Sequence, residues 1–321
     1  MESEKEEPTL PINILKQTSS YLNTTEAYCW SITCKRFHFL FRTHDFFLSS
    51  FLECVVRGEQ DDAMNFLKKI DLTLMIKKGA VIDYSNRHFS NISAFQYILG
   101  ALDTRYMWGM FLRCIREDKL LSFQKKKEIV LELLNQYQEV ENKGITYTLH
   151  GITHKNEPHF GFTPLLKTLG TYVKDYRLLP QPGIYFGKEV GKAQTLVSAH
   201  VAQHYCDLDY SFSAKTTFTA ERFMRRLDVH GYWGGIFKWW NSSVLGQLYG
   251  AIYGTIRADN NDAKQMFTPS PMLAKIDLDA MTTLFEVRMK DRLAIGTQLE
   301  IFLKELEQAL NSQEHFSLNI K

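Results

Sequence analysis

The segment "HVAQH" contains two histidines whose spacing suits metal binding. His200 and His204 lie four residues apart, and Cys206 and Asp207 follow closely. Residues four apart share one face of a helix, so the two imidazoles could hold a zinc ion together. A metalloprotease with this spacing needs a glutamate as general base after the first histidine, where this chain has Val201. We therefore favour two ordinary helix histidines and keep a metal-dependent enzyme centred on His200 and His204 as an alternative.

Two other stretches contain chemically versatile residues without a recognisable catalytic pattern. "HGITHKNEPH" (150–159) has three histidines and Glu157 in a loop-like setting, and we interpret them as surface histidines. "GKEVGKA" (187–193) is not a phosphate-binding loop, because its glycines are one residue too close together. Ala193 also replaces the Ser or Thr that would reach magnesium. No Ser–His–Asp or Cys–His arrangement has a recognisable context, so we expect a protein without catalytic residues and without a cofactor.

The composition is that of an ordinary soluble protein. Hydrophobic residues make up 45% of the 321 positions and charged residues 23%, which excludes a disordered chain and suggests two or three domains. The net charge of +2 gives no indication of nucleic-acid binding. Five cysteines without a CxxC pair indicate reduced thiols in a cytosolic compartment. The acidic N-terminus "MESEKEEP" does not have the pattern of a secretory signal.

The spacing of the hydrophobic residues predicts a mainly α protein. Residues 50–78 have apolar positions at helical spacing on both sides of a glycine, which predicts two short helices. Long helices are expected over 121–140 and 277–311, whereas 143–195, rich in β-branched residues and prolines, predicts loops or a short hairpin. The apolar stretch 231–256 is interrupted by polar residues, so we expect a buried helical region there and no transmembrane segment.

The N-terminal stretch "LPINILKQTSSYLNTTEAYCWSITCKRFHFL" (10–40) resembles an F-box. Its three helix-length pieces have more large apolar side chains than so short a segment can bury against itself. Leu-Pro, Ile-Leu, Tyr-Leu and Cys-Lys-Arg-Phe follow one another in the F-box order and spacing, although Asn13 and Thr18 depart from the usual acidic and aliphatic residues. F-boxes dock on the Skp adaptor of Skp–cullin–F-box ubiquitin ligases. The resemblance implies that the adaptor is bound through Leu10, Pro11, Ile14, Leu15, Tyr21 and Leu22.

The following residues also resemble parts of known proteins. Residues 51–103 are similar to the ankyrin-related segments of effectors from intracellular bacteria of the Legionella type, several of which have an F-box before a repeat-like domain. "GFTPLLKTLG" (161–170) is similar to the opening of an ankyrin unit. The C-terminal segment 299–321 bears spaced glutamates, as do the translocation signals of type IV secretion substrates. The resemblance implies a bacterial protein that a type IV system secretes into host cytosol.

Together these patterns predict an F-box at 1–45, a helical ankyrin-like region at 46–142, the loop or hairpin segment 143–195, and a helical region at 196–321. We expect the last region to pack with 46–142 as one recognition domain. The protein would be a non-catalytic substrate receptor, whose partners are the Skp adaptor, through it a cullin ligase, and an unknown host target protein. The alternative within this class is an F-box-bearing scaffold that binds or inhibits a host protein without causing its ubiquitination.

The irregular segment 143–195 is the expected place for target binding. Binding residues concentrate on loops held by a rigid scaffold, and aromatic residues are typical interface anchors. Tyr185 and Phe186 are therefore the candidate target-binding residues. Packing of the same rings onto the neighbouring helices explains them equally well.

Overall fold

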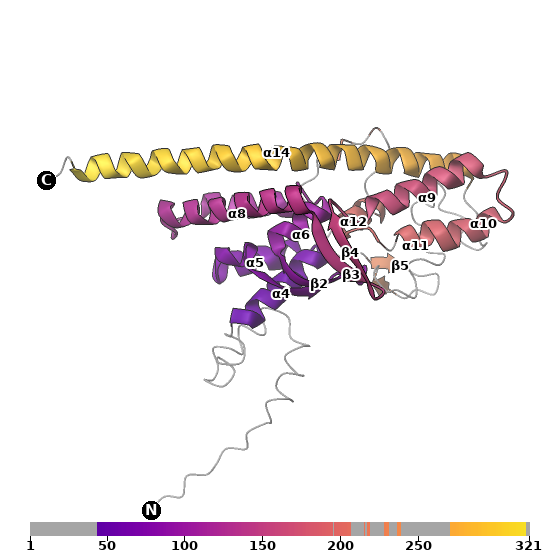
Figure 1. Ribbon diagram of the computed structural model, residues 1–321, viewed down its shortest axis with the longest axis horizontal. Helices are drawn as coiled ribbons and strands as arrows, with labels where there is room; N and C mark the ends of the chain where they lie inside the picture. Colours follow the sequence, from indigo (N-terminus) through magenta and orange to yellow (C-terminus); the bar gives the residue numbers. More distant parts are fainter. Residues whose placement is uncertain are drawn as a thin grey trace, which may run out of the picture.

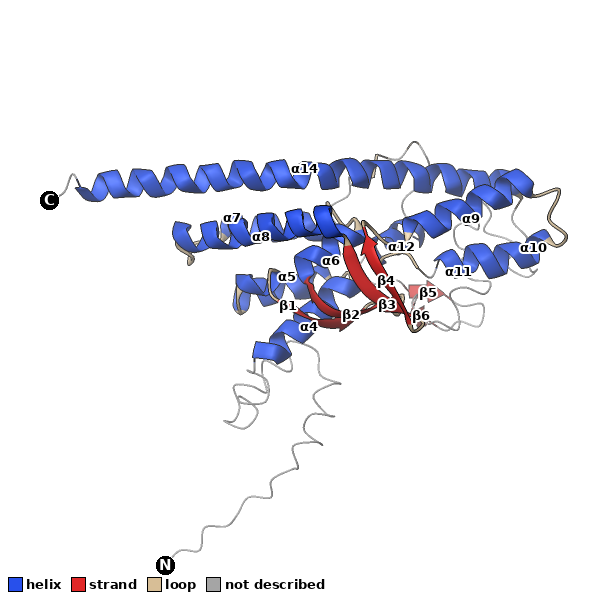
Figure 2. Ribbon diagram, in the orientation of Figure 1, coloured by secondary structure: helices blue, strands red, loops and turns tan. Residues whose placement is uncertain are grey.

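The computed structural model describes residues 44–194, 196–206, 215, 217, 218, 228–230, 236–238 and 270–318. These residues form a mainly helical protein with a small four-stranded antiparallel sheet, which confirms the predicted fold class at this level (Figures 1 and 2). The six candidate adaptor-binding residues of the F-box-like stretch lie outside the described residues, as does nearly all of the predicted segment 1–45.

The N-terminal half of the described chain alternates short helices with two strands, and the C-terminal half ends in a very long helix. The first half comprises α4 (His44–Arg57), α5 (Gln60–Lys69), η1 (Leu72–Met75), β1 (Lys78–Ile82), β2 (His88–Ser93), α6 (Ala94–Ala101), α7 (Met107–Glu117) and α8 (Phe123–Lys143). The second comprises β3 (Ile145–Leu149), β4 (Ile152–Glu157), α9 (Phe162–Asp175), α10 (Pro182–Tyr185), the π-helical η2 (Phe186–Val190), α11 (Gly191–Gln194), α12 (Ala199–Cys206), β5 (Asp228–His230), β6 (Ile236–Lys238) and α14 (Pro271–Leu318).

Local sequence signals set the ends of the central helices. Ser93 caps α6 in a capping box, since its hydroxyl accepts from the Gln96 backbone N–H while the Gln96 side chain accepts from the Ser93 N–H. The Ser122 hydroxyl caps α8 by accepting from the Lys125 backbone N–H, and Gly144 ends α8 with a positive φ of 64°. A Cβ at Gly144 would also lie 2.4 Å from a backbone atom of Asn156, so this turn into the sheet requires glycine.

The sheet has the strand order β1-β2-β3-β4, and each neighbouring pair is antiparallel. Segment 143–195 was predicted to contain loops or a short hairpin, and its first part forms the hairpin β3–β4. The pairing of β1 with β2 was not predicted from the sequence. In this hairpin Phe89 pairs opposite Val81, and both side chains are buried.

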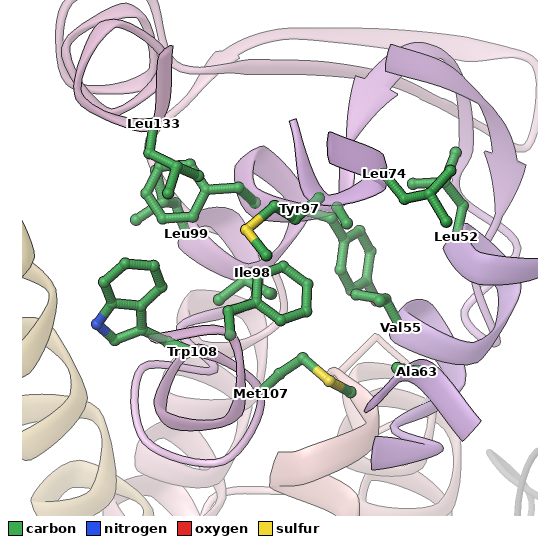
Figure 3. Close-up of a cluster of buried hydrophobic side chains, with 14 of the residues drawn as sticks. Leu52, Val55, Ala63, Leu74, Tyr97, Ile98, Leu99, Met107, Trp108 and Leu133 are labelled. Carbon is green, nitrogen blue, oxygen red and sulfur yellow. The ribbon is translucent and has the colours of Figure 1, made fainter. Parts of the chain in front are cut away.

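A first hydrophobic cluster gathers the helices and strands of the N-terminal half. Figure 3 shows its centre, where Leu52 and Val55 of α4, Ala63 of α5 and the side chains of α6 and α7 converge. Phe51 of α4 is fully buried and stacks on Phe111 of α7 at 5.9 Å between ring centroids. The expected boundary at residue 46 therefore falls inside α4, a helix whose following residues belong to this core.

The C-terminal helix α14 joins this cluster to a second one. It lies along α8 and α9 (Figure 1), and its residues Ile295, Leu299, Phe302 and Leu306 complete the first cluster. Its N-terminal part packs with Phe162 and other residues of α9, η2 and α12 in the second cluster. Gly296 permits a close approach to α8, because a Cβ there would lie 2.7 Å from the Tyr137 ring. Regions 46–142 and 270–318 thus pack together.

Residues 162–175 and 182–194 are helical, which differs from the expectation of loops. Their prolines suggested irregular structure, but Pro164 lies in the first turn of α9 and Pro182 begins α10. A proline is well tolerated in the first helical turn, because the N–H that it lacks would have no partner there.

The apolar stretch 231–256 lies almost entirely outside the described residues. Its described part, Ile236–Lys238, is the strand β6, paired with β5, where a helix was expected. Among the described helices, none combines the length and the apolar character needed to cross a bilayer.

Candidate functional site: a buried polar junction beneath α14

Asp103 is the central carboxylate of a group of buried polar side chains between the two clusters. It follows the left-handed residue Leu102 at the end of α6, and its carboxylate accepts from the Met107 backbone N–H at 3.0 Å, at the start of α7. Its side chain is almost completely buried, and this burial raises the pKa of Asp103 to about 6, although the Met107 hydrogen bond and the charge of Arg288 act in the opposite direction.

The opposing charges come from α14 and from the turn before α7. Arg288 is fully buried, with its guanidinium 3.8 Å from the Asp291 carboxylate, and burial lowers the pKa of Arg288 to about 10. Arg105 donates two hydrogen bonds to the same carboxylate, at 2.5 and 3.0 Å. Asp291 thus connects α14 to the α6–α7 turn by a bidentate ion pair, the strongest geometry that Arg and Asp can adopt.

His200, one of the two candidate metal ligands, lies in this junction. Its Nδ1 atom is 3.0 Å from the Ser198 hydroxyl and 4.0 Å from the Asp103 carboxylate, and all three side chains are buried. In a Ser–His–Asp triad the serine and the aspartate face opposite nitrogens of the imidazole. Here both face Nδ1, and the Ser198 hydroxyl lies 3.1 Å from the Ala101 carbonyl, to which it donates. The arrangement fixes the ring in place and lacks the geometry that activates a nucleophile.

The expected helix through "HVAQH" is present as α12, but the structure does not bring its polar residues together as a metal site. The His200 ring points into the junction, while the His204 side chain lies outside what the structure describes. Within the described residues, no group of three His, Cys, Asp or Glu side chains is arranged to hold a metal ion.

The three histidines of 150–159 are also separated. His150 has a positive φ in the tight turn of the β3–β4 hairpin. His154 stacks on Tyr147 across this hairpin, with 4.9 Å between ring centroids. His159 packs edge-on against Phe285 of α14, where burial and the neighbouring Arg292 lower its pKa. The lowered pKa favours the neutral form of His159, and the packing of its ring against α14 contradicts a purely surface role.

Arg292 fixes α14 a turn further along the helix. Its guanidinium donates to the Glu141 carboxylate of α8 at 2.5 and 2.8 Å and to the Pro158 carbonyl. Towards the end of α14, Glu307 pairs with Lys127 at 2.9 Å and Glu305 approaches Arg116 at 3.8 Å. Two of the spaced glutamates that suggested a translocation signal thus also contact the body of the protein.

A second buried ion pair lies in the β1–β2 turn and was not identified from the sequence. Asp83 and Arg87 are both 2% exposed at their side chains and are 3.0 Å apart. The Arg87 guanidinium also lies over the rings of Phe160 at 4.7 Å and Tyr147 at 5.4 Å. The local sequence looks like that of a solvated turn. The pair is buried by the rings of Tyr147 and Phe160, which lie about 60 or more residues later in the chain.

The candidate target-binding rings lie in the second cluster. Phe186 is 2% exposed and packs edge-on against Tyr172 of α9, with 4.8 Å between centroids. Tyr185 is partly buried and stacks on the same tyrosine at 6.3 Å. The burial of Phe186 agrees with the alternative in which these rings pack the segment onto its neighbours, and only Tyr185 has part of its side chain available to a partner.

The fold and the junction define a mainly helical protein whose long last helix is held over two hydrophobic clusters by partly buried ion pairs. The family model described as the CBUA0006 C-terminal domain matches residues 164–299. Over 268 residues the chain is 30% identical to the uncharacterized protein CBUA0006 of Coxiella burnetii (strain RSA 493 / Nine Mile phase I), covering 78% of this chain and 74% of that protein. The chain belongs to the CBUA0006 family. No solved structure matches it.

Replacing Asp103 by Asn is expected to make the free energy of unfolding less dependent on pH between about 4 and 6. The folded protein holds the Asp103 proton up to about pH 6, whereas the ordinary pKa is 3.8. The resulting stabilisation is complete below pH 3.8 and is lost as the pH rises through about 6. A shift of this size corresponds to roughly 3 kcal/mol.

The measurement is urea unfolding of wild type and Asp103→Asn at several pH values. Asn keeps an oxygen for the Met107 N–H, so the variant should gain stability relative to wild type as the pH rises. Parallel pH profiles for the two proteins would show that Asp103 does not titrate in this range.

Proposed function

We propose that this protein is the substrate-receptor subunit of a Skp–cullin–F-box ubiquitin ligase. The observation that carries the proposal is the order and spacing of the Leu-Pro, Ile-Leu, Tyr-Leu and Cys-Lys-Arg-Phe residues in 10–40. The surplus of apolar side chains in so short a stretch also supports the proposal, because a group of helices that docks on a partner presents one apolar face to it.

The described domain suits the other half of such a receptor. α4 begins at His44, directly after the F-box-like stretch, and its Phe47, Phe51 and Leu52 side chains pack into or against the first cluster. Over 44–117 a pair of helices is followed by a hairpin and then by a second pair of helices. This order is compatible with the proposed ankyrin-like character of the region.

The mechanism would be proximity alone, with no chemistry by this chain. The F-box would bind the adaptor, the recognition domain would bind a host protein, and the assembled ligase would raise the effective concentration of its ubiquitin-loaded enzyme at lysines of that protein. Delivery into host cytosol by a type IV system belongs to the same proposal and rests on the resemblance to Legionella-type effectors.

The experiment compares wild type with the double variant Leu10→Ala/Pro11→Ala in capture from a host-cell lysate. Adaptor and cullin should be captured by wild type alone, whereas the target should be captured by both. Adding ubiquitin and its activating enzymes to the captured material should modify the target only with wild type. An unmodified target in the presence of bound adaptor would favour the scaffold alternative, and equal adaptor capture by both proteins would contradict the F-box itself.

A further inference from the structure

One end of the molecule exposes large apolar side chains from three different segments. The end of α9, the connection to α10 and the start of α14 lie together at the right of Figure 1, and α9 packs along α14. Leu178, which follows α9, is 80% exposed, and Ile184 of α10 is 51% exposed. Met272 and Ile276, one turn apart on α14, are 71% and 45% exposed. We call these four residues the apolar end.

The backbone beneath these side chains is well supported by the second cluster. Tyr172 of α9 contacts both Tyr185 and Phe186, which follow Ile184 directly. Ala274, between Met272 and Ile276, is fully buried. The Leu178 backbone N–H donates to the Asp175 carbonyl at 2.8 Å. The four apolar side chains therefore stay in water although their neighbours in the sequence reach the core.

Positive charge is in excess on α9–α11 at the same end, whereas the start of α14 contributes Lys275, Asp277 and Asp279. Residues 162–194 contain five Lys or Arg and two Asp or Glu, a net charge of +3, whereas the entire chain has +2. Lys174, Arg177 and Lys188 are exposed, and none of them forms an ion pair within the part of the chain that the structure describes. Asp175 and Glu189 are the two acidic residues of this segment. The local excess of cations favours an anionic partner.

We propose that the apolar end binds the surface of an anionic lipid bilayer. Its apolar side chains come from separate segments that lie together at one end of the described chain (Figure 1), so none of the other described elements stands between them and a planar partner. Lys and Arg next to them can direct their charges to lipid headgroups while Leu178 and Ile184 enter the interface. This inference goes beyond ligase function, because it places the recognition domain at a membrane and does not involve the F-box-like stretch.

The test is sedimentation of the full-length protein with vesicles of phosphatidylcholine, with and without phosphatidylserine. Binding should require the anionic lipid and weaken with added salt, since screening reduces the attraction of the cations. Replacing both Leu178 and Ile184 by Glu should lower the vesicle affinity about tenfold or more, because neither side chain can then leave water. Arg177→Gln should lower it about fivefold.

The matched control is Leu120→Glu, which changes a 95% exposed leucine in the turn before α8. That turn lies near the other end of α14, since Lys127 pairs with Glu307, so this variant should bind vesicles as wild type does. All replaced side chains are exposed, and unchanged thermal unfolding would show that the variants are folded. Leu10→Ala/Pro11→Ala should also keep vesicle binding, which separates this inference from the ligase proposal.

Equal sedimentation with neutral and anionic vesicles, or full binding by Leu178→Glu/Ile184→Glu, would overturn the proposal. The proposal would also be overturned if wild type did not bind vesicles and Leu178→Glu/Ile184→Glu lost a host protein that wild type captures. The apolar end would then be a protein-binding surface.

Discussion

Replacing Asp83 by Ala is expected to lower the free energy of unfolding by about 3–5 kcal/mol. The carboxylate accepts from the backbone N–H groups of Ser85 and Arg87, both at 2.9 Å, and from the Arg87 guanidinium at 3.0 Å. Without it, a side chain that is almost fully buried keeps its positive charge but loses its counter-ion, and such a charge is costly in an apolar environment. The aromatic faces of Tyr147 and Phe160 offset only part of that cost.

Urea unfolding at pH 7 measures this effect, with two further variants as controls. Asp83→Ala/Arg87→Met removes both charges and should recover part of the lost stability. Glu53→Ala breaks an ion pair with Arg57, which is also four residues away. The side chains of Arg57 and Glu53 are 42% and 48% exposed, so the loss of this pair should lower the free energy of unfolding by at most about 1 kcal/mol. A cost for Asp83→Ala as small as that for Glu53→Ala would show that the turn is not held by its buried ion pair.

Replacing Phe186 by Ala is the second change with a large expected effect, about 3–5 kcal/mol. The ring is 2% exposed and its removal leaves a cavity beside Tyr172. Tyr185→Ala should cost less, because that ring is only partly buried and stacks on Tyr172 at a longer centroid distance of 6.3 Å.

Thermal and urea unfolding of the two single variants distinguish packing from target binding. A Phe186→Ala protein that unfolds like wild type but no longer captures a host protein would support the target-binding interpretation and contradict the burial argument. If Tyr185→Ala alone loses the target at full stability, the partly buried Tyr185 ring is the anchor.

The helices and their inward faces were predictable where the hydrophobic spacing was regular. Leu52, Val55 and Val56 of α4 and Ile129, Val130 and Leu133 of α8 are buried as the spacing predicts, because a 3.6-residue period defines one helix face regardless of its partner. The hairpin at 145–157 followed from β-branched and aromatic residues. Segment 162–194 was misassigned, since Pro164 and Pro182 mark helix starts as well as loops.

The junction could not be predicted, because its members are brought together only by the tertiary structure. Asp103 and Arg288 are 185 positions apart, and nothing in either local sequence indicates burial. His200 was correctly placed on a helix with four-residue spacing to His204, but the spacing does not say which face of α12 turns inward. A buried serine at Ser198 and a carboxylate from the α6–α7 turn determine the environment of that ring.

The proposal that residues 10–40 bind the Skp adaptor is tested by the affinity of the purified full-length protein for the purified adaptor. Leu10 and Pro11 would open the docking face, and interface anchors of this kind typically cost 2 kcal/mol or more each when truncated to alanine. Leu10→Ala/Pro11→Ala should therefore weaken adaptor binding about a hundredfold or more, whereas Leu120→Ala, a change of similar size at an exposed site, should not. We expect tight adaptor binding by wild type, and for the double variant unchanged urea unfolding and loss of adaptor binding. Absence of adaptor binding by wild type, or equal affinity in the double variant, would contradict the proposal.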